Sequence, residues 1–347
     1  MIKVTHLIWS LATGGVETML VDIINEQVKY ALVSLIVMND SVDSELVRSL
    51  DKKCNVFCCS RKVGSKNPLP FFKLNYWLFK TKPDIIHVHG GGLGKVSLYP
   101  APKVFTIHNA HSESSEYKKY KALYSISKAV QKYTKGQGFE SVVVENGIRV
   151  KDIRVKEDNS ASEIMRIVQI GRLYHPHKGQ HILIEAMNII VNEMKENKIY
   201  VDFIGDGASY TYLVELVRKY HLKEYVRFLG GHTRKFIYDN LCKYDLLIQP
   251  SISEGFGLTV AEAMVACVPV LVSNVPGTME VIGQGEYGKY FETDNPRSLA
   301  DSILQIKTDG CNRKRLKEAR DYAISNFDIS HTAQTYLAEY KRILNKS

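Results

Sequence analysis

The sequence predicts an α/β protein with two doubly wound, Rossmann-like domains that face each other across a cleft. Short apolar runs alternate with helical patterns along most of the chain, and this alternation predicts parallel sheets covered by helices on both faces. A polar segment without periodicity, residues 151–163, interrupts the alternation and indicates an interdomain linker. The chain of 347 residues is long for one core and suits two domains of ordinary size.

The first domain is expected over residues 1–150. Its strands are predicted at residues 4–9, 31–38, 56–59, 84–89, 103–108 and 141–144, with a helix from residue 16 to about residue 29. Ligands of such sheets bind at the carboxyl ends of the strands. Gly14 and Gly15 follow the first strand and His108 ends the fifth, so all three are candidate site residues. An ordinary turn and a satisfied strand-end histidine remain the alternatives.

The second domain is expected over residues 164–327. Its strands are predicted at residues 165–170, 200–204, 226–229, 245–249 and 269–273, with helices at residues 296–308 and 313–326. A last helix, at residues 330–345, is expected to follow this domain. Gly205 and Gly207 form a turn at the end of one of these strands, so they are expected to line the site.

The composition is typical of a globular enzyme, with 45% hydrophobic and 24% charged residues. No apolar run reaches the roughly 18 residues that a membrane span needs, and the N-terminus leads directly into a strand. The protein is therefore expected to be cytoplasmic and to lack a signal peptide. Its six cysteines show neither metal-binding nor disulfide spacing and are expected to be reduced.

Positive charge is concentrated in one stretch of the chain. The net charge is +9, and residues 51–135 alone contain sixteen basic and four acidic residues. Such a stretch attracts an anionic partner, which could be a phospholipid membrane, a phosphorylated acceptor or nucleic acid. Residues 71–80 combine aromatics with lysines, which suits an interfacial helix, although packing on a sheet would use the same aromatics.

A second basic segment suits a lipid headgroup or a sugar, with a solvated helix face as the alternative. Its residues are Tyr117, Lys118, Lys119 and Lys121. Basic residues interleaved with tyrosine would also suit single-stranded nucleic acid. No RNA-binding motif accompanies them, so nucleic acid is not expected as a partner.

The stretch 251–269, SISEGFGLTVAEAMVACVP, carries the most informative pattern. An apolar run ends there in a Ser/Glu/Gly turn and helical spacing follows, which predicts a strand, a tight turn and a helix N-terminus. Gly255 and Gly257 let the backbone approach a ligand, and the first helical turn favours an anion. Glu254 and Glu262 could contact opposite ends of one elongated ligand. A helix cap and a solvated helix face are the alternatives for these two glutamates.

Two cations follow the strand predicted at residues 165–170. Arg172 can fork onto phosphate oxygens, and Lys178 brings a compact charge to the start of the next helix. Two cations across a loop containing glycine and proline would be costly to crowd unless an anion sits between them. The pattern therefore predicts an anion site, with incidental surface charge as the alternative.

The segment from Glu254 to Glu262, EGFGLTVAE, resembles the E-x7-E signature of the retaining family-4 glycosyltransferases, which have the GT-B fold. This resemblance implies that Glu254 approaches the donor sugar and that Glu262 approaches the nucleotide ribose. Residues 171–179 resemble the G-R-L…K-G motif of the same family, whose arginine and lysine hold the donor diphosphate. The same role is thereby implied for Arg172 and Lys178.

The resemblance covers nearly the whole chain. His108 matches the T-x-H position, where the imidazole lies near the reacting face of the sugar, and the last helix, residues 328–347, would cross back to the first domain. The residues that the resemblance places at the donor are Gly14, Gly15, Arg172, Lys178, Gly205, Gly207, Glu254, Gly255, Phe256, Gly257, Leu258 and Glu262. One departure is residues 265–269, which lack the family's usual glycine before Val-Pro and leave the end of that helix open.

We therefore expect a retaining glycosyltransferase that moves a sugar from a UDP- or GDP-sugar to a glycan or lipid-linked glycan, as in bacterial lipopolysaccharide, capsule or other surface-polysaccharide synthesis. Cleavage of the donor leaves negative charge on the phosphate. The chain contains no Asp-x-Asp motif, whereas Arg172, Lys178 and the helix N-terminus near Gly257 can stabilise that charge. The reaction is predicted to need neither a metal nor another cofactor. The enzyme could lie peripherally on the inner face of the plasma membrane.

Other classes of function remain open. A non-catalytic scaffold would bind a nucleotide sugar without transferring it, a sugar phosphorylase would need free phosphate, and an epimerase would turn over the donor without an acceptor. A glycoside hydrolase is disfavoured, because glutamates eight positions apart along a helix lie about 12 Å apart, beyond the separation that hydrolases use.

Overall fold

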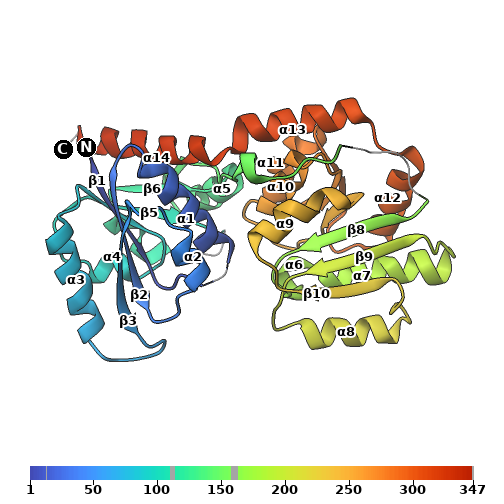
Figure 1. The fold of residues 1–347 in the computed structure, drawn as a ribbon, viewed down its shortest axis with the longest axis horizontal. Coiled ribbons are helices and arrows are strands. Elements are labelled where there is room, and N and C mark those ends of the chain that lie inside the picture. Colours follow the sequence, from blue (N-terminus) through green and yellow to red (C-terminus); the bar gives the residue numbers. More distant parts are fainter. Residues whose placement is uncertain (13, 110–113, 158–162, 346–347) are drawn as a thin grey trace. The chain divides into compact units, whose positions relative to one another are not determined.

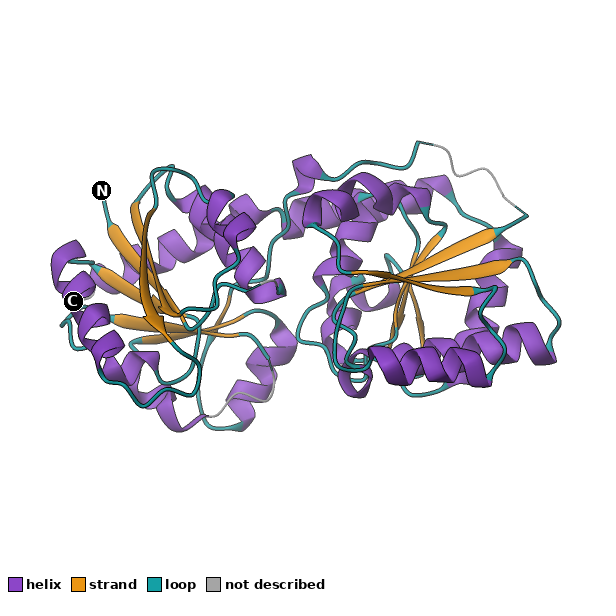
Figure 2. Cartoon of the chain, turned by 60° about the horizontal axis from the view of Figure 1, so that its bottom comes forward, coloured by secondary structure: helices purple, strands orange, loops and turns teal. Residues whose placement is uncertain are grey.

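The computed structural model describes residues 1–12, 14–109, 114–157 and 163–345. The chain forms two compact units, each with its own parallel sheet and helices on both sides of that sheet (Figures 1 and 2). Unit 1 comprises Met1–Ile148 together with Phe327–Ser347, and unit 2 comprises Arg149–Asn326.

The sheet of unit 1 has the strand order β3-β2-β1-β4-β5-β6-β7, and all neighbouring strands are parallel. Its strands are β1 (Lys3–Ile8), β2 (Leu32–Asn39), β3 (Asn55–Arg61), β4 (Ile85–Val88), β5 (Lys103–Ile107), β6 (Ala122–Ser125) and β7 (Val142–Val143). Its helices are α1 (Gly15–Gln27), α2 (Ser44–Arg48), α3 (Leu69–Thr81), α4 (Leu93–Val96), α5 (Lys128–Gly136) and α14 (Ile329–Leu344).

The C-terminal helix α14 is part of unit 1, where it lies beside α1 (Figure 1). Tyr336, Leu337, Tyr340 and Ile343 fall at helical spacing and are buried in one core with α1 and one face of the sheet. Because side chains alternate along a strand, His6 in β1 points to this same face. The space between the sheet and the pair α1 and α14 therefore holds both aliphatic and imidazole side chains.

The sheet of unit 2 has the strand order β10-β9-β8-β11-β12-β13, again with all neighbours parallel. Its strands are β8 (Met165–Ile170), β9 (Ile199–Ile204), β10 (Val226–Gly230), β11 (Leu246–Gln249), β12 (Val270–Ser273) and β13 (Lys289–Phe291). Its helices are α6 (His175–Lys178), α7 (Gln180–Asn188), α8 (Tyr210–Lys219), α9 (Arg234–Asn240), α10 (Leu258–Val265), α11 (Pro276–Val281), α12 (Pro296–Asp309) and α13 (Arg313–Phe327), whose last residue is assigned to unit 1.

Two short strands are not predicted from the sequence. β6 has four residues and directly follows a charged segment, and β13 has three residues, of which Lys289 and Tyr290 are exposed. Neither forms an apolar run long enough to predict a strand on its own. Both gain their strand conformation by pairing with a neighbour in the sheet.

The segment predicted as a linker, residues 151–163, is packed on unit 2 over part of its described length. The backbone N–H groups of Arg154 and Lys156 donate to the carbonyls of Tyr238 at 3.1 Å and Ala266 at 2.9 Å. The ammonium of Lys156 also contacts Asp245 at 2.7 Å. These bonds explain why unit 2 begins at residue 149; residues 158–162 of the predicted linker lie outside the described residues.

Each sheet has one point where the strand order reverses direction. In unit 1 this topological switch point lies between β1 and β4, and in unit 2 it lies between β8 and β11. The loops that leave the carboxyl ends of these strands diverge to opposite faces of the sheet, which opens a crevice for a ligand. The fold thus marks one candidate position in each unit.

Candidate active site

The switch point of unit 2 brings together two residues that are far apart in the sequence. Lys178 ends α6 in the loop region after β8, and Glu254 lies in the turn between β11 and α10. The Nζ atom of Lys178 lies 2.6 Å from Oε2 of Glu254, and the two side chains are 28% and 14% exposed. An ammonium and a carboxylate therefore meet at the position where this fold binds its ligands.

Backbone contacts hold the two loops together. Gly179 adopts a left-handed φ of 64°, and a Cβ atom at this position would lie only 1.8 Å from the carbonyl oxygen of Pro250. The carbonyl of His177 accepts hydrogen bonds from the N–H groups of Ile252 at 2.9 Å and Ser253 at 3.2 Å. Only glycine fits at residue 179, so the close backbone contact that brings Lys178 to the turn after β11 depends on this glycine.

The carboxylate of Glu254 is held through one oxygen. In addition to Lys178, the side chains of Gln249 and Ser251 donate to Oε2 at 3.1 and 3.2 Å. Among the described residues, Oε1 has no hydrogen-bond partner. One oxygen is thus fixed in place, and the other is available to accept a hydrogen bond from a bound molecule.

Further positive character surrounds this pair. Arg172 lies in the loop after β8 with an exposed side chain, and it forms no ion pair with any residue that the structure describes. Among the residues that the structure describes, no side chain caps the N-terminus of α10, which starts after Gly257. An uncapped helix N-terminus and a free guanidinium both favour an anion. This part of unit 2 can therefore bind a ligand that carries negative charge.

The switch point of unit 1 has a different chemistry. Gly14 precedes α1, where its carbonyl accepts hydrogen bonds from the N–H and the hydroxyl of Thr18, and Gly15 is the first residue of that helix. His108 directly follows β5, and burial lowers the pKa of its imidazole to about 4. The imidazole is therefore neutral at pH 7 and can act as a hydrogen-bonding group but carries no charge.

Comparison with known proteins assigns both halves of the chain. Residues 13–152 match the family described as Glycosyltransferase Family 4, and residues 151–322 match the family described as Glycosyl transferases group 1. The chain belongs to the family-4 glycosyltransferases. The expectation of a transferase is thereby confirmed.

Individual relatives agree with this assignment. An uncharacterized glycosyltransferase of Methanocaldococcus jannaschii is 29% identical over 255 residues, which cover 68% of each chain. The N-acetylgalactosamine-N,N'-diacetylbacillosaminyl-diphospho-undecaprenol 4-alpha-N-acetylgalactosaminyltransferase of Campylobacter jejuni is 23% identical and aligns with 96% of this chain and 99% of its own. The solved structure of Anabaena Alr3699/HepE in complex with UDP has a TM-score of 0.78 at 20% identity, with 98% and 100% of the chains covered. The predicted α/β fold, GT-B with two Rossmann-like domains, is confirmed.

In this glycosyltransferase the second glutamate of the motif is buried. Glu262 is 6% exposed, accepts a hydrogen bond from the hydroxyl of Tyr238 at 3.2 Å and lies 3.8 Å from the guanidinium of Arg234. The alternative of a solvated helix face is therefore wrong. α10 begins only at Leu258, so Glu254 lies outside the helix. The separation of about 12 Å assumed that both glutamates lie in one helix, so it no longer applies, and the family assignment replaces it as the argument against a hydrolase.

The other residues of the predicted donor set lie around the same loops. Gly205 and Gly207 follow β9, and a Cβ atom on either would come within 2.1 Å and 2.4 Å of carbonyl oxygens in the loop after β8. Gly255 belongs to the turn that contains Glu254. The side chain of Phe256 is buried and that of Leu258 is half-buried, so Phe256 supports the turn from inside the unit.

The predicted acceptor or membrane segment is not exposed throughout. The expectation that Tyr117 lies at the surface is wrong, because it is only 2% exposed and packs its ring between Phe105 and Phe139. Composition alone conceals this, because the buried tyrosine is followed directly by exposed lysines. Lys118, Lys119 and Lys121 are exposed, so these three of the four residues predicted in this segment remain candidates for contact with an anionic partner.

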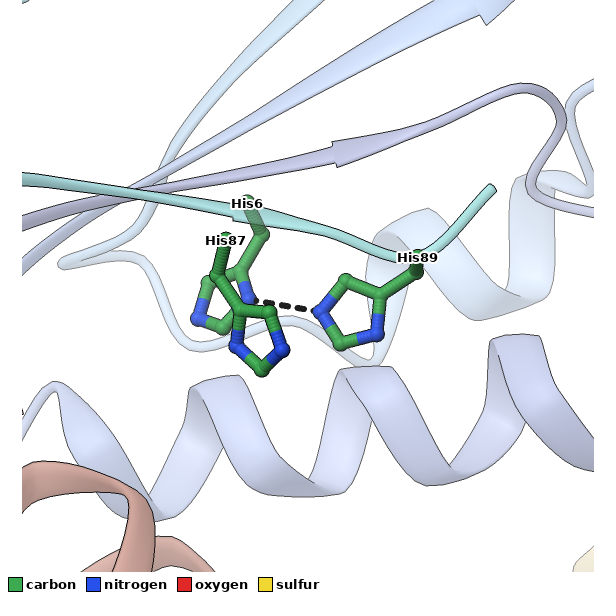
Figure 3. A group of neighbouring side chains, drawn as sticks. All are labelled: His6, His87 and His89. Atoms are coloured by element: carbon green, nitrogen blue, oxygen red, sulfur yellow. Dashed lines mark hydrogen bonds between the residues drawn. The ribbon is translucent and has the colours of Figure 1, made fainter. Parts of the chain in front are cut away.

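One group of three potential metal ligands occurs among the described residues, namely His6, His87 and His89 in unit 1 (Figure 3). All three are buried, and their ring nitrogens are engaged in hydrogen bonds with one another or with neighbouring side chains. The rings of His87 and His89 lie 4.1 Å apart between centroids and are tilted by 35° to each other. The arrangement is that of a hydrogen-bond network, and it does not fit a metal ion. The sequence does not reveal it, because its members come from different strands.

Proposed function

We propose that this glycosyltransferase transfers a sugar from a UDP- or GDP-sugar to a hydroxyl of a glycan or lipid-linked glycan, with retention of anomeric configuration and without a metal. The observation that carries the proposal is the contact between Lys178 and Glu254 at the switch point of unit 2. Two comparisons support the substrate classes. Anabaena Alr3699/HepE was solved with UDP, and the Campylobacter relative is named for a saccharide linked to diphospho-undecaprenol.

The bond that breaks joins the anomeric carbon to a phosphate oxygen, and its electron pair stays with the nucleoside diphosphate. Arg172, Lys178 and the N-terminus of α10 are the groups that stabilise this negative charge. The acceptor oxygen forms the new bond on the same face of the sugar, and its proton passes to the departing phosphate oxygen. Charge stabilisation by these groups supports metal-independent transfer, together with the lack of an Asp-x-Asp motif in the sequence.

In this scheme Glu254 positions the donor. Its Oε2 is held by three donors, and its Oε1 accepts a hydrogen bond from a hydroxyl of the donor sugar. When the diphosphate arrives, the ammonium of Lys178 contacts both the carboxylate and a phosphate oxygen. The ion pair therefore keeps the lysine close to where the leaving group will lie.

A thermal-shift series with UDP-, GDP- and ADP-sugars tests the donor, because a ligand of the folded state raises the melting temperature. We expect stabilisation by UDP- or GDP-sugars, transfer that is unchanged in EDTA, and a product with the anomeric configuration of the donor. Binding without turnover would indicate a scaffold. Turnover that depends on free phosphate would indicate a phosphorylase, and turnover of the donor without an acceptor would indicate an epimerase. Loss of transfer in EDTA that Mg²⁺ restores would refute metal independence.

We also propose that the enzyme lies peripherally on the inner face of the cytoplasmic membrane, through helix α3. The exposed side chains of α3 include Leu69, Phe72, Tyr76 and Phe79, which are 53–69% exposed. Lys73 and Lys80 are exposed on the same helix. Eight basic residues and no acidic one occur from residue 52 to residue 82. Exposed apolar side chains flanked by lysines suit the interface of an anionic bilayer.

Sedimentation with anionic vesicles tests this location. The variant Phe72→Ser/Lys73→Glu/Lys80→Glu should lose vesicle binding, since it removes apolar area and reverses two charges. The variant Lys118→Glu/Lys119→Glu/Lys121→Glu changes charge even more and serves as the matched control. Stronger loss in the second variant would place the contact at the 117–121 segment. No binding of the wild type to any anionic vesicle would reject the membrane proposal.

A further inference from the structure

Four imidazoles come together at the switch point of unit 1. His6 lies in β1, His87 in β4, His89 directly after β4 and His108 directly after β5. Figure 3 shows His6, His87 and His89 between the strands and a helix, with the rings of His6 and His89 joined by a hydrogen bond. This position between β1 and β4 is where the topology of unit 1 places its ligand crevice.

Three hydrogen bonds connect the interior of unit 1 to His108 through two of these histidines. Oε1 of Gln27 in α1 lies 2.8 Å from Nε2 of His6. Nδ1 of His6 lies 3.0 Å from Nε2 of His89, and Nδ1 of His89 lies 3.4 Å from Nε2 of His108. His87 is outside this chain, because its ring nitrogens contact the hydroxyls of Thr106 and Tyr340 instead.

Burial decides the protonation state of the chain. It lowers the pKa of His6 to about 4, as it does for His108, and it holds the pKa of His89 well below the ordinary value for histidine. All three rings are therefore neutral at pH 7. A neutral imidazole has one N–H donor and one acceptor nitrogen, so the partner of one nitrogen determines the role of the other.

The direction of the chain then follows from its inner end. Oε1 of Gln27 can only accept, so His6 carries its proton on Nε2 and accepts at Nδ1. His89 must then donate from Nε2 and accept at Nδ1, which leaves His108 to donate from Nε2. Nδ1 of His108 is thus an acceptor. It is buried and has no partner among the described residues.

We propose that His6 and His89 are positioning residues that hold His108 in its Nε2–H tautomer, so that Nδ1 of His108 accepts a hydrogen bond from a hydroxyl of the bound sugar. The role of His108 in the reaction rests on the proposed function, whereas its tautomer does not. A sugar hydroxyl is a suitable partner because it can donate to a neutral nitrogen without a change of charge. Through this chain, the side-chain amide of Gln27 in the core determines that Nδ1 of His108 is a hydrogen-bond acceptor at the crevice.

Nitrogen-15 NMR of histidine-labelled protein tests the tautomer directly. In the wild type, His108 should show a protonated Nε2 and an unprotonated Nδ1. In His89→Phe the acceptor for Nε2–H is gone, so the His108 signals should shift towards the other tautomer or an average of the two. A protonated Nδ1 on His108 in the wild type, or unchanged signals in the variant, would overturn the proposal.

His87→Phe is the matched control. It removes an imidazole from the same buried cluster with the same change of volume, but it leaves the chain from Gln27 to His108 intact. The kcat of His89→Phe should fall by roughly ten- to a hundredfold with little change in KM, as for other outer partners that orient an imidazole. The kcat of His87→Phe should fall much less. Equal losses in both variants would mean that the cluster acts only through folding, which would overturn the positioning role.

His89→Gln provides the rescue. A glutamine can donate to Nδ1 of His6 through its amide nitrogen and accept from Nε2 of His108 through its amide oxygen, so it preserves the direction of the chain. Both the tautomer of His108 and most of kcat should be retained. A tautomer shift in His89→Phe without any change in kcat would remove His108 from the reaction while leaving the hydrogen-bond chain standing, so the two hypotheses fail separately.

Discussion

The two switch points of this glycosyltransferase have the same topology and opposite chemistry. In unit 1, His6 in β1, His89 after β4 and His108 after β5 form a buried, neutral network of imidazoles. In unit 2, the loops after β8 and β11 instead hold an ammonium and a carboxylate that are partly exposed. A parallel sheet determines where loops converge, and burial determines which groups can remain charged there. The fold therefore determines where the functional groups lie, and local solvation determines whether they stay charged.

Acidification should lower the stability of unit 1 more than that of unit 2. The unfolded chain protonates its histidines near pH 6.5, but burial lowers the pKa of His6 and His108 to about 4 in the folded state. The unfolded state therefore binds more protons between these values, so stability is constant above about pH 7 and decreases as the pH falls from 6.5 towards 4. Between pH 7 and pH 5, His6 and His108 should each lower the free energy of unfolding by roughly 2 kcal/mol.

Hydrogen exchange measures this loss locally, after correction for the intrinsic pH dependence of exchange. Amides of β1 and β4 should lose protection on acidification more than amides of β8 and β11. In His89→Phe the pH dependence of β1 and β4 should be weaker, because one buried imidazole is missing. Equal pH dependence in the two sheets would contradict the comparison.

Removal of the cation tests unit 2. Lys178→Met should lower kcat by roughly 10²- to 10³-fold, because a preorganised positive charge near the leaving phosphate is lost. The melting temperature should change little, since the ion pair is partly exposed. Steady-state kinetics and thermal unfolding of the same preparation separate the two effects.

Lys307→Met is the matched control for this substitution. Lys307 forms an ion pair with Glu196 at 2.8 Å in the same unit, with side chains 21% and 27% exposed. Loss of this pair should leave kcat unchanged within about twofold. A similar loss of activity in both variants would show that ion pairing in unit 2 serves folding and not transfer.

The backbone approach between the two loops of unit 2 is tested at Gly179. Gly179→Ala should reduce the stability of unit 2 by roughly 2–5 kcal/mol, because the left-handed conformation and the clash with Pro250 add together. Gly138 also has a positive φ, 84°, in the backbone hydrogen-bond pattern that ends α5, and a Cβ atom there would meet no other atom within 4 Å, so Gly138→Ala should cost only about 1–2 kcal/mol. Denaturant unfolding of both variants gives the difference, and equal values would show that the Pro250 contact yields freely.

Replacing Cys267 with glycine should give a small gain in the stability of unit 2. After α10, Cys267 adopts a left-handed φ of 57°, and the N–H groups of Cys267 and Val268 donate to Met264 and Ala263. This is a Schellman motif with cysteine where glycine is preferred. Cys267→Gly should stabilise unit 2 by roughly 0.5–1 kcal/mol, and Ala266→Gly, in the helical region, should destabilise it by a similar amount. A loss of stability in Cys267→Gly would mean that the thiol's packing outweighs the strain.

That motif also answers a question that the sequence leaves open. The missing glycine at residues 265–269 makes the end of the helix uncertain, and the structure shows that the usual backbone hydrogen bonds form without it. Most strands and the last three helices, by contrast, lie within a few residues of their predicted limits. Apolar periodicity is a local property that survives in the fold whenever the run is long enough.

The two-domain α/β class, the family and the loops that carry Arg172, Lys178 and Glu254 could be predicted from the sequence, because they depend on short patterns along the chain. The burial of Tyr117 and Glu262 could not be predicted in this way and is seen only in the three-dimensional structure. The same holds for the hydrogen-bond chain of His6, His89 and His108. Burial and side-chain pairing depend on which strands become neighbours in the sheet. That choice is made by contacts between residues as far as 80 or more positions apart, such as His6 and His89, and no local pattern records it.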